Sequence, residues 1–163
     1  MGIIPQITLG VFLKQILPCI AVPNLGGMII AFTTMKEVET WYETLNKPWW
    51  TPPPVTFPIV WTFVYTSMGL ASWLIFRSEG ATRLLALILY CIQLILNFMW
   101  SPLFFNGHLI TGALVDISLL WIVVALCIFA FLPLNKLASA LMVPYLIWLS
   151  IATSLNFWIW KYN

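Results

Sequence analysis

The chain has 163 residues, of which 62% are hydrophobic and 7% are charged, with a formal net charge of +2. Soluble domains carry about 25% charged residues, so this composition, with a mean hydropathy of +0.98, excludes a soluble globular protein. We expect membrane lipid around the chain and no nucleic-acid partner.

Five apolar segments follow one another, each near the roughly 20 residues that a helix needs to cross the hydrocarbon layer. We predict an all-α integral membrane bundle, one domain over residues 1–163, with five transmembrane helices at about 13–34, 53–76, 84–105, 110–132 and 137–160. The connections are short, so consecutive helices should pack as antiparallel neighbours. The basic residues are divided almost evenly between the two sides, which leaves the orientation in the membrane open.

The first span is interrupted by Pro23, Gly26 and Gly27. Glycine allows neighbouring backbones to approach closely, and Pro23 frees a backbone carbonyl and kinks the helix. This pattern predicts close packing of the first span. A ligand entrance or a dimer contact is the alternative, and the pattern does not separate them.

The first connection contains WYETLNKPWWTPP at residues 41–53. Thr34 and Glu37 have capping-box spacing, and the hydrophobic residues after them recur at helical intervals, at Val38, Trp41, Tyr42 and Leu45. We therefore predict a short amphipathic helix in this loop. It would serve either as an interfacial anchor or as a cover over a cavity.

Polar and aromatic side chains fall on one face of the third span and one face of the fifth. The two sets are Gln93, Asn97, Trp100 and Ser101, and Tyr145, Trp148, Ala152 and Asn156. Because polar groups in lipid are tolerated mainly toward the interior of a bundle, we expect a shared interior. Asn97 with Trp61, Trp100 and Trp148 suits a flat, mostly apolar ligand with one or two polar edges. Hydrogen bonding between helices is the alternative use of the amides.

The remaining reactive side chains predict no catalytic residue, metal site or cofactor. Asp116 is the one acid expected inside a span, where it bonds a neighbouring helix or lies near the membrane edge; a proton or cation site is the alternative. His108 stands in a tight loop, with haem ligation as its alternative. Cys19, Cys91 and Cys127 are isolated in apolar spans and are expected to be small buried hydrophobic residues.

The chain resembles a known family in six motifs that follow in order and spacing over nearly its whole length. These are PNLGG at 23–27, WYETLNKPWWTPP at 41–53, VWTFVY at 60–65, QLILNFMWSPLFF at 93–105, ALVDISLLW at 113–121 and PYLIWLSIATSLNFWIW at 144–160. They are similar to the translocator protein family, also called tryptophan-rich sensory proteins or peripheral-type benzodiazepine receptors (TspO/MBR).

The resemblance implies a five-helix bundle, commonly a homodimer, whose cavity opens under the first loop. Its ligands would be tetrapyrroles such as protoporphyrin IX and haem-related molecules, benzodiazepine-type and isoquinoline drugs and, in animal members, cholesterol. The membrane would be the mitochondrial outer membrane in an animal and the bacterial envelope otherwise. The ligand-lining positions carried over from the motifs are Tyr42, Trp50, Phe57, Trp61, Asn97, Trp100, Leu119, Trp148, Ala152 and Leu155.

One departure concerns the family's sterol pattern at the end of the fifth helix. That pattern has Leu or Val, then Tyr, then a basic residue, whereas this chain has Leu155, Phe157, Trp158 and Lys161, with no tyrosine between. The strict pattern fails, and such patterns are only hypotheses when intact. Cholesterol binding is therefore expected to be weak.

Three functions are compatible with the resemblance. We favour a binding or sensory protein for tetrapyrroles or sterols, because the expected pocket offers tryptophans and one amide rather than positioned acid and base groups. A porphyrin or sterol transporter is the first alternative, although five spans without internal repeats do not favour it. A light-dependent porphyrin-degrading enzyme is the second.

Overall fold

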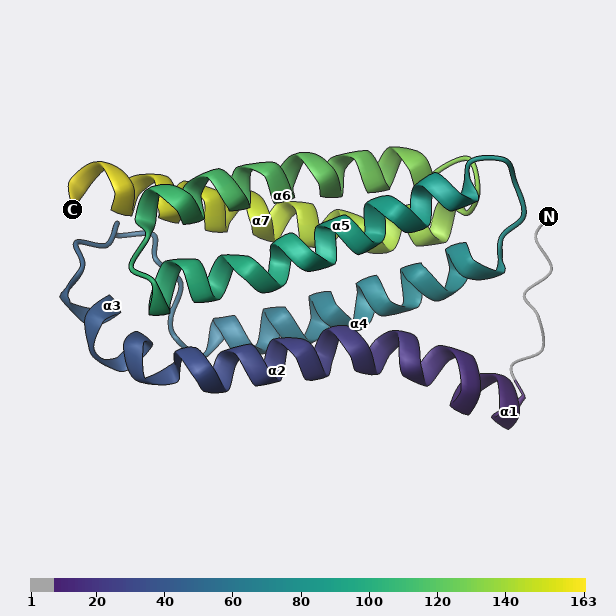
Figure 1. Ribbon diagram of the computed structural model, residues 1–163, viewed down its shortest axis with the longest axis horizontal. Helices are drawn as coiled ribbons and strands as arrows, with labels where there is room; N and C mark the ends of the chain where they lie inside the picture. The colour runs from purple at the N-terminus through teal and green to yellow at the C-terminus, as the bar shows by residue number, and fades with distance from the viewer. Residues whose placement is uncertain (1–7) are drawn as a thin grey trace.

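A computed structural model describes residues 8–163, which are almost entirely helical (Figure 1). The elements are α1 (Leu9–Val11), the π-helical turn η1 (Phe12–Ile16), α2 (Leu17–Glu39), α3 (Trp41–Thr44), α4 (Thr56–Arg77), α5 (Arg83–Ser101), the π-helical turn η2 (Pro102–Asn106), α6 (Ile110–Phe131) and α7 (Lys136–Tyr162). Five continuous helical stretches in this part of the chain are long and apolar enough to cross a membrane: Leu9–Glu39, Thr56–Arg77, Arg83–Asn106, Ile110–Phe131 and Lys136–Tyr162. The predicted all-α membrane bundle of five helices is confirmed.

The five long helices lie side by side along one axis and close into a bundle (Figure 1). α2 packs on α4, α4 on α7, α7 on α6 and α6 on α5, and α5 returns to α2. Consecutive helices are antiparallel neighbours, as expected from the short connections, but α4 packs mainly against α2 and α7 and touches α5 less.

The core is concentrated on α4, α6 and α7, while α2 is peripheral. Met68, Leu120 and Leu149 are fully buried at the centre of the bundle. In α2, by contrast, Pro23 and Thr34 are the buried residues, and most of its large apolar side chains face outward. α2 therefore adds a wall to the bundle rather than a share of its core.

Glycines let α2 sit close to its neighbours, as the first-span pattern predicted. A Cβ on Gly26 would lie 2.3 Å from the Phe98 ring, and one on Gly27 would lie 2.2 Å from the Tyr65 ring. On α4, a Cβ on Gly69 would lie 2.6 Å from the backbone oxygen of Cys19. Each glycine provides a recess that a larger residue would fill.

The predicted amphipathic helix of the first loop is not confirmed. α2 continues through Thr34 to Glu39, so the Thr34 hydroxyl, instead of capping a new helix, donates to the backbone oxygen of Ile30 at 3.0 Å. Only the single turn α3 follows, before a proline-rich segment that cannot continue a helix. The capping-box spacing was misleading because threonine inside a helix can bond back to its own preceding turn.

Candidate ligand-binding site

Three rings from α4 and α7 form the centre of the candidate site. Phe57 and Trp61 are four residues apart on α4 and so share one face. Both meet Trp148 of α7 edge to face, with ring centroids 5.6 Å and 6.4 Å apart. Such pairs add to the energy of apolar burial. Trp61 also stacks on the Tyr65 ring, with centroids 5.3 Å apart.

Asn97 of α5 joins three helices through its amide. Its Oδ1 accepts a hydrogen bond from the Tyr65 hydroxyl at 2.8 Å, and its Nδ2 donates to the Tyr145 hydroxyl at 2.6 Å. The interhelical use left open by the sequence is thus present in the ligand-free protein. A side-chain amide has two donor hydrogens and two acceptor lone pairs, so one of each remains.

The indole N–H of Trp148 is buried and has no hydrogen-bond partner within residues 8–163. The same is true of the side-chain oxygen of Gln93, one helical turn before Asn97 on α5. An unpaired buried donor costs free energy in an apolar interior. The centre of the site therefore contains a donor that a ligand acceptor would satisfy.

A second aromatic cluster lies at the end of the bundle below the first loop. Trp100 stacks on Phe104 with centroids 5.4 Å apart, and its indole N–H donates to Oδ1 of Asn156 at 3.0 Å. Tyr42 of α3 packs its ring against Phe104 and Phe105. Burial, and then the neighbouring Glu43 carboxylate, raises the pKa of Tyr42 above its ordinary value of 10.0, so its hydroxyl stays neutral.

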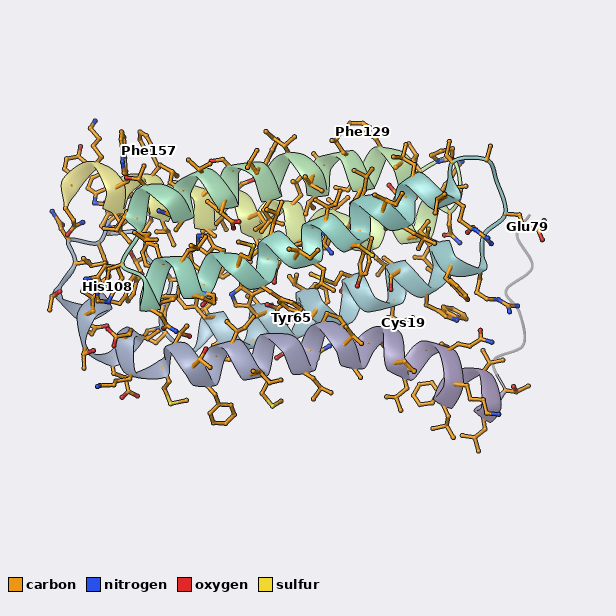
Figure 2. All side chains as sticks on the ribbon, in the orientation of Figure 1. Cys19, Tyr65, Glu79, His108, Phe129 and Phe157 are labelled. Carbon is orange, nitrogen blue, oxygen red and sulfur yellow. The ribbon has the colours of Figure 1, made fainter. Side chains whose placement is uncertain are left out.

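The first loop is tied to the bundle near His108, which lies at the α3 end (Figure 2). The His108 ring stacks on Trp41 with centroids 4.1 Å apart, and its Nε2 lies 3.1 Å from a carboxylate oxygen of Glu37. His108 has a φ of 52°, a backbone conformation that few non-glycine residues adopt. The turn between η2 and α6 thus holds the end of α2 and the start of α3.

Two further contacts hold the rest of the loop. The ring of Trp50 meets Trp158 of α7 edge to face at 5.0 Å. The backbone N–H of Asn46 donates to Oδ1 of Asn163 at 2.8 Å. Trp49, in contrast, is 91% exposed. The loop therefore covers the end of the bundle through a few separable contacts.

The ten positions carried over from the resemblance do not form a single cluster. Phe57, Trp61, Asn97, Trp148 and Ala152 lie at the centre, whereas Tyr42, Trp50 and Trp100 lie at the loop end. Leu155 is buried on α7, but Leu119 is 49% exposed on the outside of α6. Tyr65 was missed, although its i+4 spacing from Trp61 could have placed it on the same face.

The four residues of the predicted sterol region do not share one face. Leu155 is buried, whereas Phe157 projects outward, where it contacts Trp160 (Figure 2). Trp158 packs against Trp50 and Tyr162. The Lys161 ammonium lies over the Tyr162 ring, 5.4 Å from its centroid.

The predictions made for the isolated reactive residues, Asp116 and the three cysteines, are met only in part. Oδ2 of Asp116 is buried and has no partner in the described part of the chain, so no bond from this oxygen to a neighbouring helix is found. Cys127 is buried as expected, but Cys19 is only partly buried and Cys91 is exposed on the outside of α5.

Comparison with known proteins agrees with the family resemblance that the sequence motifs indicated. The chain matches the TspO/MBR family over residues 19–161. It is 38% identical over 146 residues to the tryptophan-rich sensory protein of Cereibacter sphaeroides, covering 90% of this chain and 87% of that protein. It is 40% identical over 155 residues to the tryptophan-rich protein TspO of Chlorobaculum tepidum, covering 92% and 98%. It is 37% identical over 145 residues to the translocator protein of Sus scrofa, covering 87% and 86%.

Proposed function

The chain belongs to the TspO/MBR family of membrane sensory and translocator proteins, and we propose that it binds a tetrapyrrole such as protoporphyrin IX between α4 and α7, beneath the first loop. It is a multi-pass membrane protein, with a general role in sensing or translocation. The identity of the ligand and the location of its site are our proposal.

The observation that carries the proposal is the buried, unpaired indole N–H of Trp148, beside the rings of Phe57 and Trp61. A tetrapyrrole is a wide flat ring with acceptor groups at its edge. Its face would stack on the aromatic rings, and an edge acceptor would pair with the indole N–H. The remaining hydrogen-bonding capacity of Asn97 would orient a second polar group.

Binding requires movement, because the rings of Phe57, Trp61 and Trp148 contact one another in the ligand-free protein. The first loop is the proposed cover, since it is fastened at its ends by an aromatic stack, a ring edge and an asparagine pair. Such covers belong to the less stable parts of a fold. Hydrogen exchange across residues 35–50 should therefore slow when protoporphyrin IX binds.

The same site is proposed to accept benzodiazepine-type drugs, whose fused rings and carbonyl edge offer the same chemistry. Cholesterol is proposed as a weaker ligand on the outer face of α7, where Phe157 stands in place of a tyrosine. We propose a homodimer and a role in binding rather than catalysis. The naming of relatives as sensory or translocator proteins supports that choice.

The test is a titration of the purified protein with protoporphyrin IX in lipid nanodiscs. Trp148→Ala removes the ring and the donor, and we expect affinity to fall by about tenfold or more, taking stacking on a nucleobase as a rough analogue. Trp148→Phe keeps one aromatic ring and removes the N–H together with part of the stacking surface, so it should lose less than Trp148→Ala, about two- to tenfold.

The control is Trp121→Phe, because the Trp121 indole bonds to Ser150 on the outer side of α6 and α7. This variant should bind like the unmodified protein. Unchanged affinity in both Trp148 variants, with the bundle still folded, would contradict the proposed site.

A further inference from the structure

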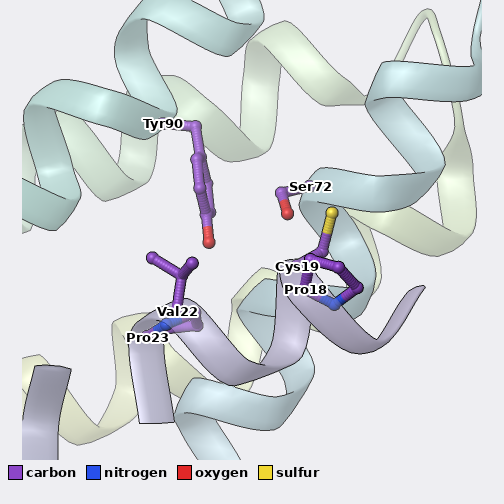
Figure 3. A pocket seen from close by; sticks show the side chains of 6 residues that line it. All are labelled: Pro18, Cys19, Val22, Pro23, Ser72 and Tyr90. Atoms are coloured by element: carbon purple, nitrogen blue, oxygen red, sulfur yellow. The ribbon is translucent and has the colours of Figure 1, made fainter. Parts of the chain in front are cut away.

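A pocket lies in the half of the bundle away from the first loop, and it is separate from the candidate site described above. It has a volume of about 270 Å³ and is open on one side. Its walls come from α2, α4 and α5 and consist of Pro18, Cys19, Val22, Pro23, Ser72 and Tyr90 (Figure 3). None of these residues belongs to the aromatic clusters described above.

The backbone of α2 explains why this space exists. Pro18 and Pro23 lack the N–H groups that an α-helix uses, and the π-helical turn η1 ends just before Pro18. Next to the pocket, Gly69 allows the α2 backbone at Cys19 and Ile20 to press directly against α4. Because α2 leans on α4, a gap remains on the side that faces α5.

The lining is apolar except for hydroxyl and thiol groups. The Tyr90 ring is 9% exposed, and its hydroxyl points into the space between Val22 and Ser72 (Figure 3). The Ser72 hydroxyl already donates to the backbone oxygen of Gly69 at 2.8 Å, so it offers the pocket its acceptor lone pairs. Tyr90 offers a donor hydrogen.

We propose that this pocket is a second binding site, for a small neutral molecule of one or two rings that carries a single hydroxyl group. The ligand hydroxyl would accept from Tyr90 and donate to Ser72, while its rings would contact Val22 and the two prolines. Among residues 8–163, the side chains that line the pocket carry no charge, which favours a neutral ligand.

The size of the pocket supports this choice. An apolar cavity of about 150 Å³ is known to hold benzene, and pockets for drug-sized ligands start near 300 Å³. A volume of about 270 Å³ therefore fits one or two rings and is too small for a tetrapyrrole. The open side lets the ligand enter from lipid.

The probe for this site is a trifluoromethyl-diazirinyl benzyl alcohol, which has one ring and one hydroxyl. The protein in nanodiscs is photolabelled, and the labelled residues are mapped by mass spectrometry. We expect saturable labelling at residues 18–23 and at Tyr90, which excess benzyl alcohol suppresses and excess protoporphyrin IX does not. The result does not depend on the proposed tetrapyrrole site, because the two sites share no residue.

Two variants separate the pocket from general partition into lipid. Val22 lines the pocket and is 56% exposed, so it lies at the open side, and Val22→Trp should block entry and strongly lower saturable labelling. Ile29→Trp, an exposed position of the same helix that does not line the pocket, should leave labelling unchanged. Tyr90→Phe should lower labelling by the alcohol about two- to tenfold. Tyr90→Phe should not affect labelling by the corresponding trifluoromethyl-diazirinyl toluene, which has a methyl group in place of the hydroxymethyl group.

Labelling that increases linearly with probe concentration, or that is the same in Val22→Trp, would overturn the proposal. If Val22→Trp does not fold, labelling of the Tyr90→Phe variant tests the proposal instead. An equal response of the alcohol and the toluene to that substitution would show that the hydroxyl is not recognised.

Discussion

The two halves of the bundle along its long axis are packed in different ways. In the half toward the first loop, aromatic rings meet in two clusters, one from α3, α5 and η2 and one from α4 and α7. In the other half, α2 and α4 touch through backbone at Gly69, and the remaining gap is left open as a pocket. Large rings and close backbone contact are thus two separate ways of joining helices in lipid.

This difference has a functional consequence. Rings that contact one another can part and close again on a flat ligand, since each keeps a stacking face in either state. A backbone contact at glycine has no side chain to move, so the pocket beside it should keep its shape. The first half is suited to a ligand that opens the site, and the second to one that fits a space already present.

The largest effect should come from removing the backbone contact. Gly69→Ala places a Cβ against backbone atoms of Cys19 and Ile20, which cannot rotate away, so we expect a loss of about 1–3 kcal/mol in the free energy of unfolding. Gly112→Ala is the matched control, because its Cβ would meet only Leu109 at 3.6 Å. Unfolding in mixed SDS micelles measures both. Equal stability of the two variants would contradict the close contact.

A somewhat smaller loss should follow Asn97→Leu in the ring-filled half. The substitution removes two interhelical hydrogen bonds, each worth about 0.6 kcal/mol on average and up to 1.7 kcal/mol, so unfolding should become easier by about 1–2 kcal/mol. Tyr65→Phe added to Asn97→Leu should recover part of this loss, because it removes a hydroxyl left unpaired. Affinity for protoporphyrin IX should fall as well. Full stability combined with weaker binding would mean that Asn97 acts on the ligand alone.

A smaller effect is expected when a contact that holds the first loop is weakened. Glu37→Gln replaces the charged acceptor beside Nε2 of His108 with a neutral amide, and since contacts between partly exposed polar groups contribute at most about 1 kcal/mol, exchange across residues 35–50 should become about two- to fivefold faster. Glu39→Gln, an exposed acid on the same helix, is the control. If the two variants exchange alike, the contact between Glu37 and His108 does not hold the loop.

The remaining effect is expected outside both halves, on the outer face of α7. Phe157→Tyr adds a hydroxyl at an outward-facing ring and should tighten cholesterol binding by about 0.5–1.5 kcal/mol, one net hydrogen bond. Tetrapyrrole affinity should stay the same. Tight cholesterol binding by the unmodified protein, with no change on substitution, would show that apolar shape and not a tyrosine carries sterol recognition.

Hydropathy and helical spacing were enough to predict the architecture, because a bilayer admits few alternatives to a full-length helix. The same spacing placed Asn97 and Trp148 in the interior, where both are buried. It could not predict that Thr34 lies within a longer α2, because a threonine hydroxyl serves equally as a cap or as a bond to the preceding turn. Nor could it reveal that Asn97 bonds to Tyr65 and Tyr145, since those partners belong to two other helices.

The exposure of Leu119 and the pocket beside Gly69 show a second limit of prediction from the sequence. A residue between two interior positions of a helix can face either way, and Leu119, next to the buried Leu120, faces outward. The prolines of α2 were visible in the sequence, but whether a proline leaves a gap depends on which neighbour the helix leans against. Here that choice depends on Gly69, far along the chain.

The peripheral position of α2 also bears on the order in which the bundle is assembled during synthesis. α2 is made before α4 and α5, yet the rings that fit its glycines belong to Tyr65 of α4 and Phe98 of α5. At about 5–20 residues per second, the ribosome needs several seconds after α2 to complete α5. For that interval the recess at Gly26 has no ring to fill it, so α2 can pack on α4 through Gly27 and Gly69 first and completes its contacts only when Phe98 arrives with α5.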